Sequence, residues 1–185
     1  MSDFRRLTYK EIIMNAPDAI YKTLEYNKEK KFRISNESNK VYFIGSGSSY
    51  SVALYGGMLF NQYTDYQTFA MSPREFIELG HPKSTVILIS QGGWNVDIID
   101  VAKKAISDGC MCTAITESLD SPFASIIGEQ NIMQLKLEGE KECFANSQGV
   151  VAACAIVLQF LDKIKSTDFA MVLICSSFNF SLNFV

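Results

Sequence analysis

The stretch VYFIGSGSSY, residues 41–50, decides the fold that we predict for this chain. Its first four residues form an apolar run rich in β-branched and aromatic side chains, which is typical of a strand buried on both faces. A Gly/Ser turn follows, and residues 49–63 are predicted to form a helix. Free N–H groups and the positive end of the helix dipole would face that turn, so the stretch predicts a phosphate site.

Further strands and helices alternate on either side of this stretch. Strands are predicted at residues 66–71, 85–89, 110–116 and 131–137, and helices at 6–27, 72–79, 96–108, 121–127 and 146–165. The third strand ends in a second Ser/Gly turn, SQGGWN, residues 90–95. This alternation predicts an α/β fold: a five-stranded parallel sheet with helices on both faces, an α-β-α sandwich.

The composition excludes several classes of protein. The net charge of −3 and the absence of a dense basic run argue against a nucleic-acid partner. His81 is the only histidine, so no His-based metal cluster and no metal is predicted. The number of cysteines is odd and the N-terminus MSDFRRLTYK is not a signal peptide, which favours a cytoplasmic setting.

Two common phosphate-binding motifs do not fit the first loop. A Walker A motif needs a Lys followed by Ser or Thr after the glycines, and this loop contains no lysine. A dinucleotide fingerprint needs a glycine where Tyr50 stands, and an acidic residue after the second strand, where the chain has Met71 and Ser72. A nicotinamide cofactor therefore fits poorly, and no cofactor is predicted.

Four short segments together resemble the sugar isomerase (SIS) domain, a phosphosugar-binding module. VYFIGSGSSY is similar to its Gly-Ser/Thr-Ser loop, and residues 86–109 resemble its Ser-Gln-Ser-Gly-Glu-Thr loop and the following helix. TYKEIIMNAPDAI (8–20) and ECFANS (142–147) resemble parts of the isomerase half of glutamine–fructose-6-phosphate aminotransferase. The resemblance implies one SIS domain over residues 1–165, closest to the first module of such tandem proteins.

This resemblance implies that the chain binds a phosphorylated sugar, a hexose or hexosamine 6-phosphate. It assigns the phosphate and the sugar to two loops and a later segment: Gly47, Ser48, Ser49, Ser90, Gln91, Gly92, Asn95, Ala145 and Ser147. Hydroxyl and amide donors can satisfy a phosphate dianion without a lysine.

The second loop departs from the family pattern. Gly92, Trp94 and Asn95 stand where the family has serine, glutamate and threonine. A lost hydrogen bond to a charged group costs about 1.5–3 kcal/mol, so weaker binding is expected unless another donor compensates. Trp94 either stacks on a sugar face or covers the loop. Glu142 is either a general base or a surface carboxylate.

Three interpretations of the function stay open. In the aminotransferase-like proteins the catalytic glutamate, histidine and lysine lie in or after a second module, which nothing here matches, so the chain is expected to be incomplete as a catalyst. It is alternatively a non-catalytic phosphosugar-binding regulatory module, or a remnant that no longer binds.

The apolar tail, residues 166–185, is expected to be a truncated linker or a packing segment rather than a membrane span. Apolar surface on residues 146–165 and on the tail predicts a homodimer.

Overall fold

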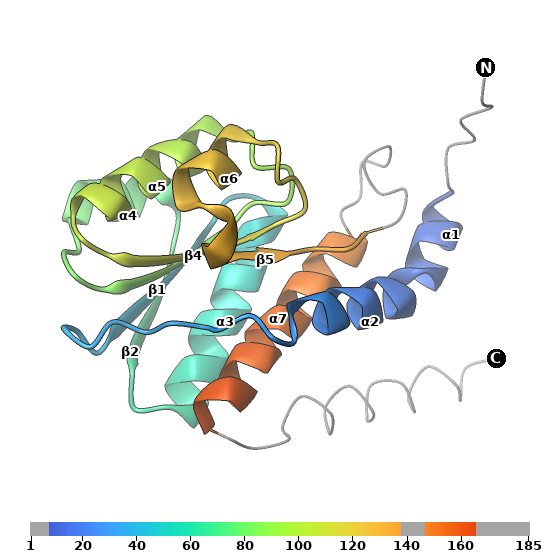
Figure 1. Cartoon of the computed structure of the whole chain (residues 1–185), viewed down its shortest axis with the longest axis horizontal. Helices are drawn as coiled ribbons and strands as arrows, with labels where there is room; N and C mark the ends of the chain where they lie inside the picture. Colours follow the sequence, from blue (N-terminus) through green and yellow to red (C-terminus); the bar gives the residue numbers. More distant parts are fainter. Residues whose placement is uncertain (1–7, 138–146, 166–185) are drawn as a thin grey trace.

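A five-stranded parallel sheet forms the centre of the computed structural model, which describes residues 8–137 and 147–165 (Figure 1). The strand order is β2-β1-β3-β4-β5. The strands are β1 (Lys40–Gly45), β2 (Gln67–Met71), β3 (Thr85–Ile89), β4 (Met111–Thr116) and β5 (Ile132–Gln134). The predicted α/β fold is confirmed, and the strand boundaries agree to within a residue except that β5 ends before residue 137.

Helices cover both faces of this sheet (Figure 1). One side holds α3 (Ser48–Tyr63) and α7 (Ser147–Lys165), with α1 (Tyr9–Met14) and α2 (Ala16–Asn27) packed against α7. The other side holds α4 (Pro73–Leu79), α5 (Val96–Ser107) and α6 (Pro122–Ile127), and a short 3-10 turn, η1 (Glu129–Asn131), leads into β5.

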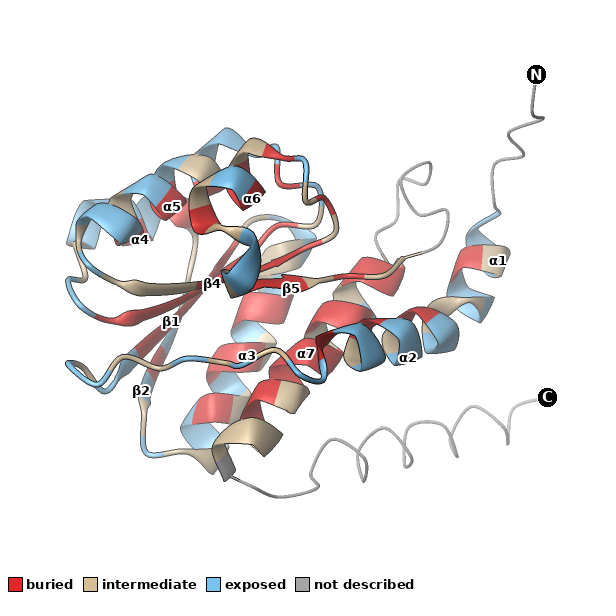
Figure 2. Cartoon of the chain, in the orientation of Figure 1, coloured by how far each residue is buried: buried red, intermediate tan, exposed pale blue. Residues whose placement is uncertain are grey.

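Two hydrophobic cores result from the alternation of side chains along the strands. Val41 and Phe43 of β1 belong to the core under α3 and α7, whereas Tyr42 and Ile44 belong to the core under α4, α5 and α6. Figure 2 shows the buried residues along the strands and on the inward sides of the helices. Because both faces are covered, the central strands are apolar runs rather than alternating sequences.

The N-terminal segment forms two helices rather than one. Thr8 and Glu11 make a capping box at the start of α1, and Asn15 caps its C-terminal end. Pro17 lies in the first turn of α2, where its missing N–H leaves no helical hydrogen bond unmade. The single helix predicted at residues 6–27 is therefore two helices in the structure.

Polar side chains of α2 satisfy the outer edge of β5, the last strand of the sheet. The Asn27 side chain donates to Gln134 O (2.8 Å) and accepts from Gln134 N (3.0 Å), and Lys136 N donates to Thr23 Oγ1 (2.9 Å). Asn27 and Thr23 are fully buried. An open strand edge exposes unpaired backbone groups, so these contacts replace the neighbour that β5 lacks.

Cys112 and Cys154 are partly buried against the two hydrophobic cores. Burial raises the pKa of the Cys112 thiol to about 12 and that of Cys154 to about 11, so both stay protonated at neutral pH.

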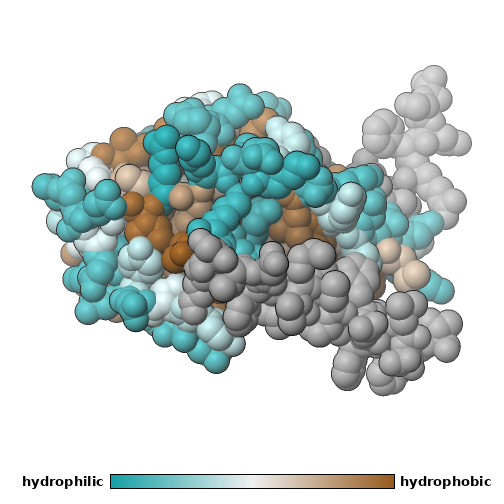
Figure 3. Space-filling view, turned by 60° about the horizontal axis from the view of Figure 1, so that its bottom comes forward, coloured by the Kyte–Doolittle hydropathy of each residue, from teal (hydrophilic) through white to brown (hydrophobic). Residues whose placement is uncertain are grey.

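Within the described ranges, Ser147–Ile164 of α7 is the one segment long and apolar enough to cross a membrane, and 56% of it is buried inside the fold. The face drawn in Figure 3 is mainly hydrophilic, with hydrophobic residues in small patches.

The histidine lies in an aromatic cluster at the amino edge of the sheet. Its ring centroid is 4.1 Å from that of Tyr42 and 4.9 Å from that of Phe76. The Nε2 atom of His81 is buried and no described residue bonds to it. Burial, and then the positive charge of Lys40, lowers the pKa of the His81 imidazole.

Asn27→Ala should lower the free energy of unfolding by about 2–4 kcal/mol, because it removes three hydrogen bonds, one to Thr23 O and two to the Gln134 backbone. Urea unfolding measures the effect. Glu25→Ala on the same helix is the matched control, because Glu25 pairs with Lys28 at the surface and its loss should matter little. Equal effects of the two substitutions would contradict the role given to Asn27.

Stability should fall as the pH drops through about 6.5, where the unfolded imidazole takes up its proton and the folded His81 does not yet do so. His81→Phe keeps an aromatic ring in the cluster and removes the titration. Its melting temperature, measured by calorimetry between about pH 8 and pH 5, should therefore decrease less than that of the wild type. Parallel curves for the two proteins would show that His81 is not responsible.

Candidate functional site

The two Gly/Ser loops start side by side at the carboxyl edge of the sheet. β1 and β3 are neighbours, and the last residue of β1, Gly45, pairs with the last residue of β3, Ile89. From β1 the chain proceeds to β2 on one side, whereas β3 lies on the other side. The order of the strands thus reverses between β1 and β3, and open α/β sheets bind their ligands at such a position.

The first loop leaves backbone donors open at the start of α3. A side chain on Gly45 would place its Cβ 2.5 Å from Ser49 O, so glycine lets the first helical turn sit against the strand end. Gly47 has φ +57° and precedes the helix without a side-chain cap. No described residue accepts a hydrogen bond from the N–H of Gly47 or Ser48. These donors and the positive end of α3 can receive an anion.

The second loop starts with a buried serine whose hydroxyl is free. Ser90 is 8% exposed, and its N–H donates to Ile115 O and extends the β3–β4 ladder by one residue. Within the described ranges, its hydroxyl has no hydrogen-bond partner. Although most of Ser90 is buried, its Oγ is accessible to solvent, so the hydroxyl can donate to a ligand at this loop.

The β4 side of the molecule holds the second loop in place. Gln91 O accepts hydrogen bonds from Thr116 Oγ1 (2.9 Å) and from Glu117 N (2.8 Å). Gly93 has φ +70°, and a Cβ there would lie 2.2 Å from the Oγ of Ser121, the cap of α6. The loop therefore needs glycine at this position to pack against α6.

Asn95 connects the two loops. Its Oδ1 accepts from Ile98 N (3.1 Å) and caps α5, while its Nδ2 donates to Ser46 Oγ (3.3 Å) in the first loop. Both ends of the amide are thus engaged within the protein. The prediction that Asn95 also donates to a phosphate stays a prediction.

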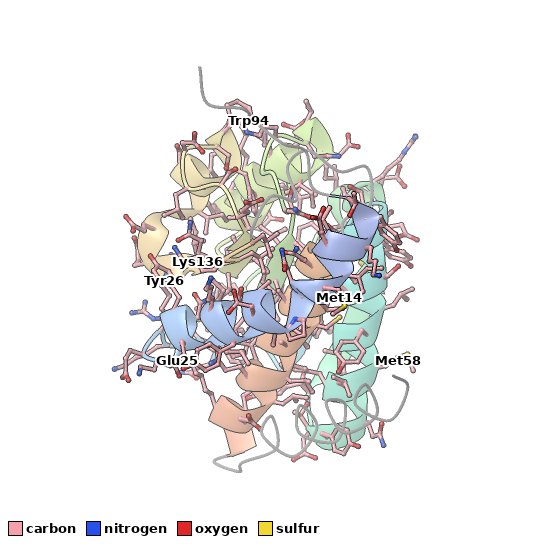
Figure 4. All side chains as sticks on the ribbon, turned by 90° about the vertical axis from the view of Figure 1, so that its right-hand side faces the viewer. Met14, Glu25, Tyr26, Met58, Trp94 and Lys136 are labelled. Atoms are coloured by element: carbon pink, nitrogen blue, oxygen red, sulfur yellow. The ribbon has the colours of Figure 1, made fainter. Side chains whose placement is uncertain are left out.

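The electrostatic character of the site comes from neutral donors. Neither residues 46–49 nor residues 90–95 include a charged side chain. Gly92 is exposed, and Trp94 is 63% exposed, so its indole is available at the loop surface (Figure 4). The arrangement can bind an oxyanion through dipoles and hydroxyls, and these two loops offer no acid or base for proton transfer.

The remaining predicted residues are only partly placed. Ser147 starts α7, whose N-terminus lies at the carboxyl edge because the helix follows β5, and its Oγ is buried with no described partner. Ala145 and Glu142 lie outside the described residues, as does the tail. His81 precedes β3 at the opposite edge of the sheet.

A hollow of about 400 Å³ lies away from the two loops. It is lined by Asn39, Tyr63, Thr64, Asp65, Tyr66 and Ile164.

Thr116 is the residue at the site that the motifs did not predict. It ends β4, a strand without a sequence motif, and only the pairing of β4 with β3 brings it beside Gln91. Its position at the end of the predicted strand 110–116 is the only signal that the sequence offers.

Comparison with known proteins supports this architecture. The SIS domain model matches residues 34–163. No curated protein matches by sequence. Glucosamine-6-phosphate deaminase from Thermotoga maritima superposes with a TM-score of 0.69 and 19% identity over 88% of this chain and 51% of its own. The sugar isomerase domain of an RpiR transcription factor from Sphaerobacter thermophilus superposes with a TM-score of 0.63 and 17% sequence identity. The superposition covers 92% of this chain and 97% of that domain.

A Listeria monocytogenes protein assigned as a sugar-phosphate isomerase gives a TM-score of 0.59 and 18% identity over 88% of this chain and 89% of its own. The chain spans about half the length of the deaminase and of several other solved relatives. At sequence identities this low, the similarity shows a shared fold and nothing further. Because the family model matches most of the chain and includes both loops, the chain belongs to the SIS domain family.

Proposed function

We propose that this chain binds a phosphorylated sugar at the carboxyl edge of β1 and β3. The observation that carries the proposal is that the Ser90 hydroxyl and the N–H groups of Gly47 and Ser48 have no hydrogen-bond partner among the described residues, on two loops that begin at adjoining strand ends. A phosphate dianion accepts several hydrogen bonds at once, so it fits this set of donors. Family membership supports phosphosugar binding in general.

The sugar is proposed to be a hexose or hexosamine 6-phosphate. The resemblance to the first module of the aminotransferase-like proteins supports this class, and Ala145 and Ser147 would face the sugar. The solved relatives include a deaminase of glucosamine 6-phosphate and the Listeria protein assigned as a sugar-phosphate isomerase. The single binding domain is proposed to comprise residues 1–165, in a cytoplasmic protein without a cofactor.

Binding without turnover is the expected behaviour of the chain by itself. The two described loops supply no acid or base, and Glu142 is the one weak candidate for a base that the sequence offers. The family resemblance favours an incomplete catalyst of the isomerase or aminotransferase type. A regulatory binding module is the second candidate, and it is supported by the similarity to the sugar isomerase domain of a transcription factor.

A homodimer is proposed from the apolar outer surface of the helices beside the sheet. α3 carries no charged residue, and its Leu54 and Met58 are 44% and 72% exposed. Met14 of α1 is 70% exposed (Figure 4). Exposed apolar side chains on the outer surface of helices are typical of an interface between subunits.

Fructose 6-phosphate and glucosamine 6-phosphate should change the fluorescence of Trp94, the only tryptophan, because it lies in the second loop. Ser90→Ala should raise the dissociation constant about tenfold or more, since it removes a hydroxyl that would donate to a charged group. Ser107→Ala, at the far end of α5, is the matched control and should bind as the wild type does.

Thermal unfolding gives an independent measurement of the same binding. At 100 times its dissociation constant a ligand stabilises by about 2.7 kcal/mol, which at this size raises the melting temperature by roughly 5–10 °C. The sugars without phosphate and NAD serve as negative controls. A shift in melting temperature with NAD alone, or no shift with any sugar phosphate, would contradict the proposed function. Turnover of a sugar phosphate would show that the chain is a complete catalyst.

A further inference from the structure

We propose that Thr116 is a positioning residue for the phosphate site: it orients the Gln91–Gly92 peptide so that Gly92 N–H faces the first loop and donates to the phosphate. This inference rests on the proposed function. It adds a residue from β4, outside both loops, and a backbone donor.

The Gln91 carbonyl is held toward β4. Thr116 Oγ1 and Glu117 N both donate to its oxygen, at 2.9 Å and 2.8 Å. Thr116 is fully buried at the end of β4, so its hydroxyl is fixed by the strand and its surroundings. Two donors on one oxygen, both from the end of the neighbouring strand, leave that peptide little freedom to turn.

The opposite side of the same peptide faces the first loop. The described chain has no cis peptide bonds, and in a trans peptide the carbonyl and the following N–H point in opposite directions. β3 lies between β4 and β1. A Gln91 carbonyl directed toward β4 therefore directs Gly92 N–H toward the end of β1, where the loop of residues 46–49 begins.

Gly92 N–H is free to bind a ligand. No described residue accepts a hydrogen bond from it, and Gly92 is exposed. Glycine has no hydroxyl to offer at a position where the resemblance places a serine, so its N–H is its only donor. Together with Gly47 N–H and Ser48 N–H it would form a set of backbone donors around an anion.

A purely structural role for Thr116 makes a different prediction. A threonine that only satisfies a buried carbonyl would change stability and leave the intrinsic affinity for phosphate unaltered. A positioning role requires the affinity to change in the folded protein. The test must therefore measure binding and stability separately.

The experiment compares Thr116→Val, which is nearly isosteric and lacks the donor, with Thr116→Ser, which keeps it. The dissociation constants for fructose 6-phosphate and inorganic phosphate are measured by Trp94 fluorescence at a temperature where melting curves show each variant folded. We expect Thr116→Val to weaken both ligands about tenfold, equivalent to about 1.4 kcal/mol, and Thr116→Ser to stay within about twofold.

Amide NMR of the ¹⁵N-labelled protein provides the second measurement. Adding fructose 6-phosphate should move the Gly92 amide proton of the wild type and of Thr116→Ser downfield, as a new hydrogen bond to phosphate requires. The shift should be smaller in Thr116→Val. If Thr116→Val does not fold, Thr116→Cys, which replaces the hydroxyl by a weak thiol donor, takes its place in both measurements.

The outcomes separate this inference from the proposed function. Wild-type binding with an unmoved Gly92 amide, or with unchanged affinity in folded Thr116→Val, overturns the role of Thr116 and leaves the phosphosugar site in place. If the wild type binds neither sugar phosphate nor phosphate, both proposals fall together. Weaker binding by Thr116→Val with a retained Gly92 response in Thr116→Ser supports the inference.

Discussion

The candidate site depends on the parallel pairing of β1 with β3. This ladder ends with Gly45 opposite Ile89, so two loops that are more than forty residues apart in sequence begin next to each other. Asn95 then joins them through Ser46. Because the donors for an anion come from both loops, a shift of the ladder by one residue would separate them and turn every side chain of β1 to the opposite face.

The site is a region of low charge in which backbone geometry carries the chemistry. Gly45 allows α3 to start against the end of the strand, and Gly93 allows α6 to approach the second loop. The resulting free N–H groups and the Ser90 hydroxyl lie at the edge of a buried sheet. Hydrogen bonds to an anion are stronger there than in bulk water, so a lysine is not needed to hold a phosphate.

Stability and site geometry are supported from different parts of the molecule. The buried Asn27 and Thr23 bond to the outer edge of β5, far along the sheet from the loops. The aromatic cluster around His81 lies at the amino edge. Among residues 8–137 and 147–165, the carboxyl edge is left with donors that have no partner. This fits a general pattern in which binding sites keep polar groups available that elsewhere in the fold are paired.

The sequence by itself determined the order of strands and helices, the parallel sheet, the two Gly/Ser loops and the family, because these follow from local apolar runs, glycine positions and short motifs. The tertiary structure alone decided which distant groups meet: Asn95 with Ser46, Thr116 with Gln91, and Asn27 with Gln134. It also decided that Thr23 and Asn27 are buried. Such pairs depend on strand order and register, and a hydrogen bond between residues far apart in the chain leaves no local pattern in the sequence.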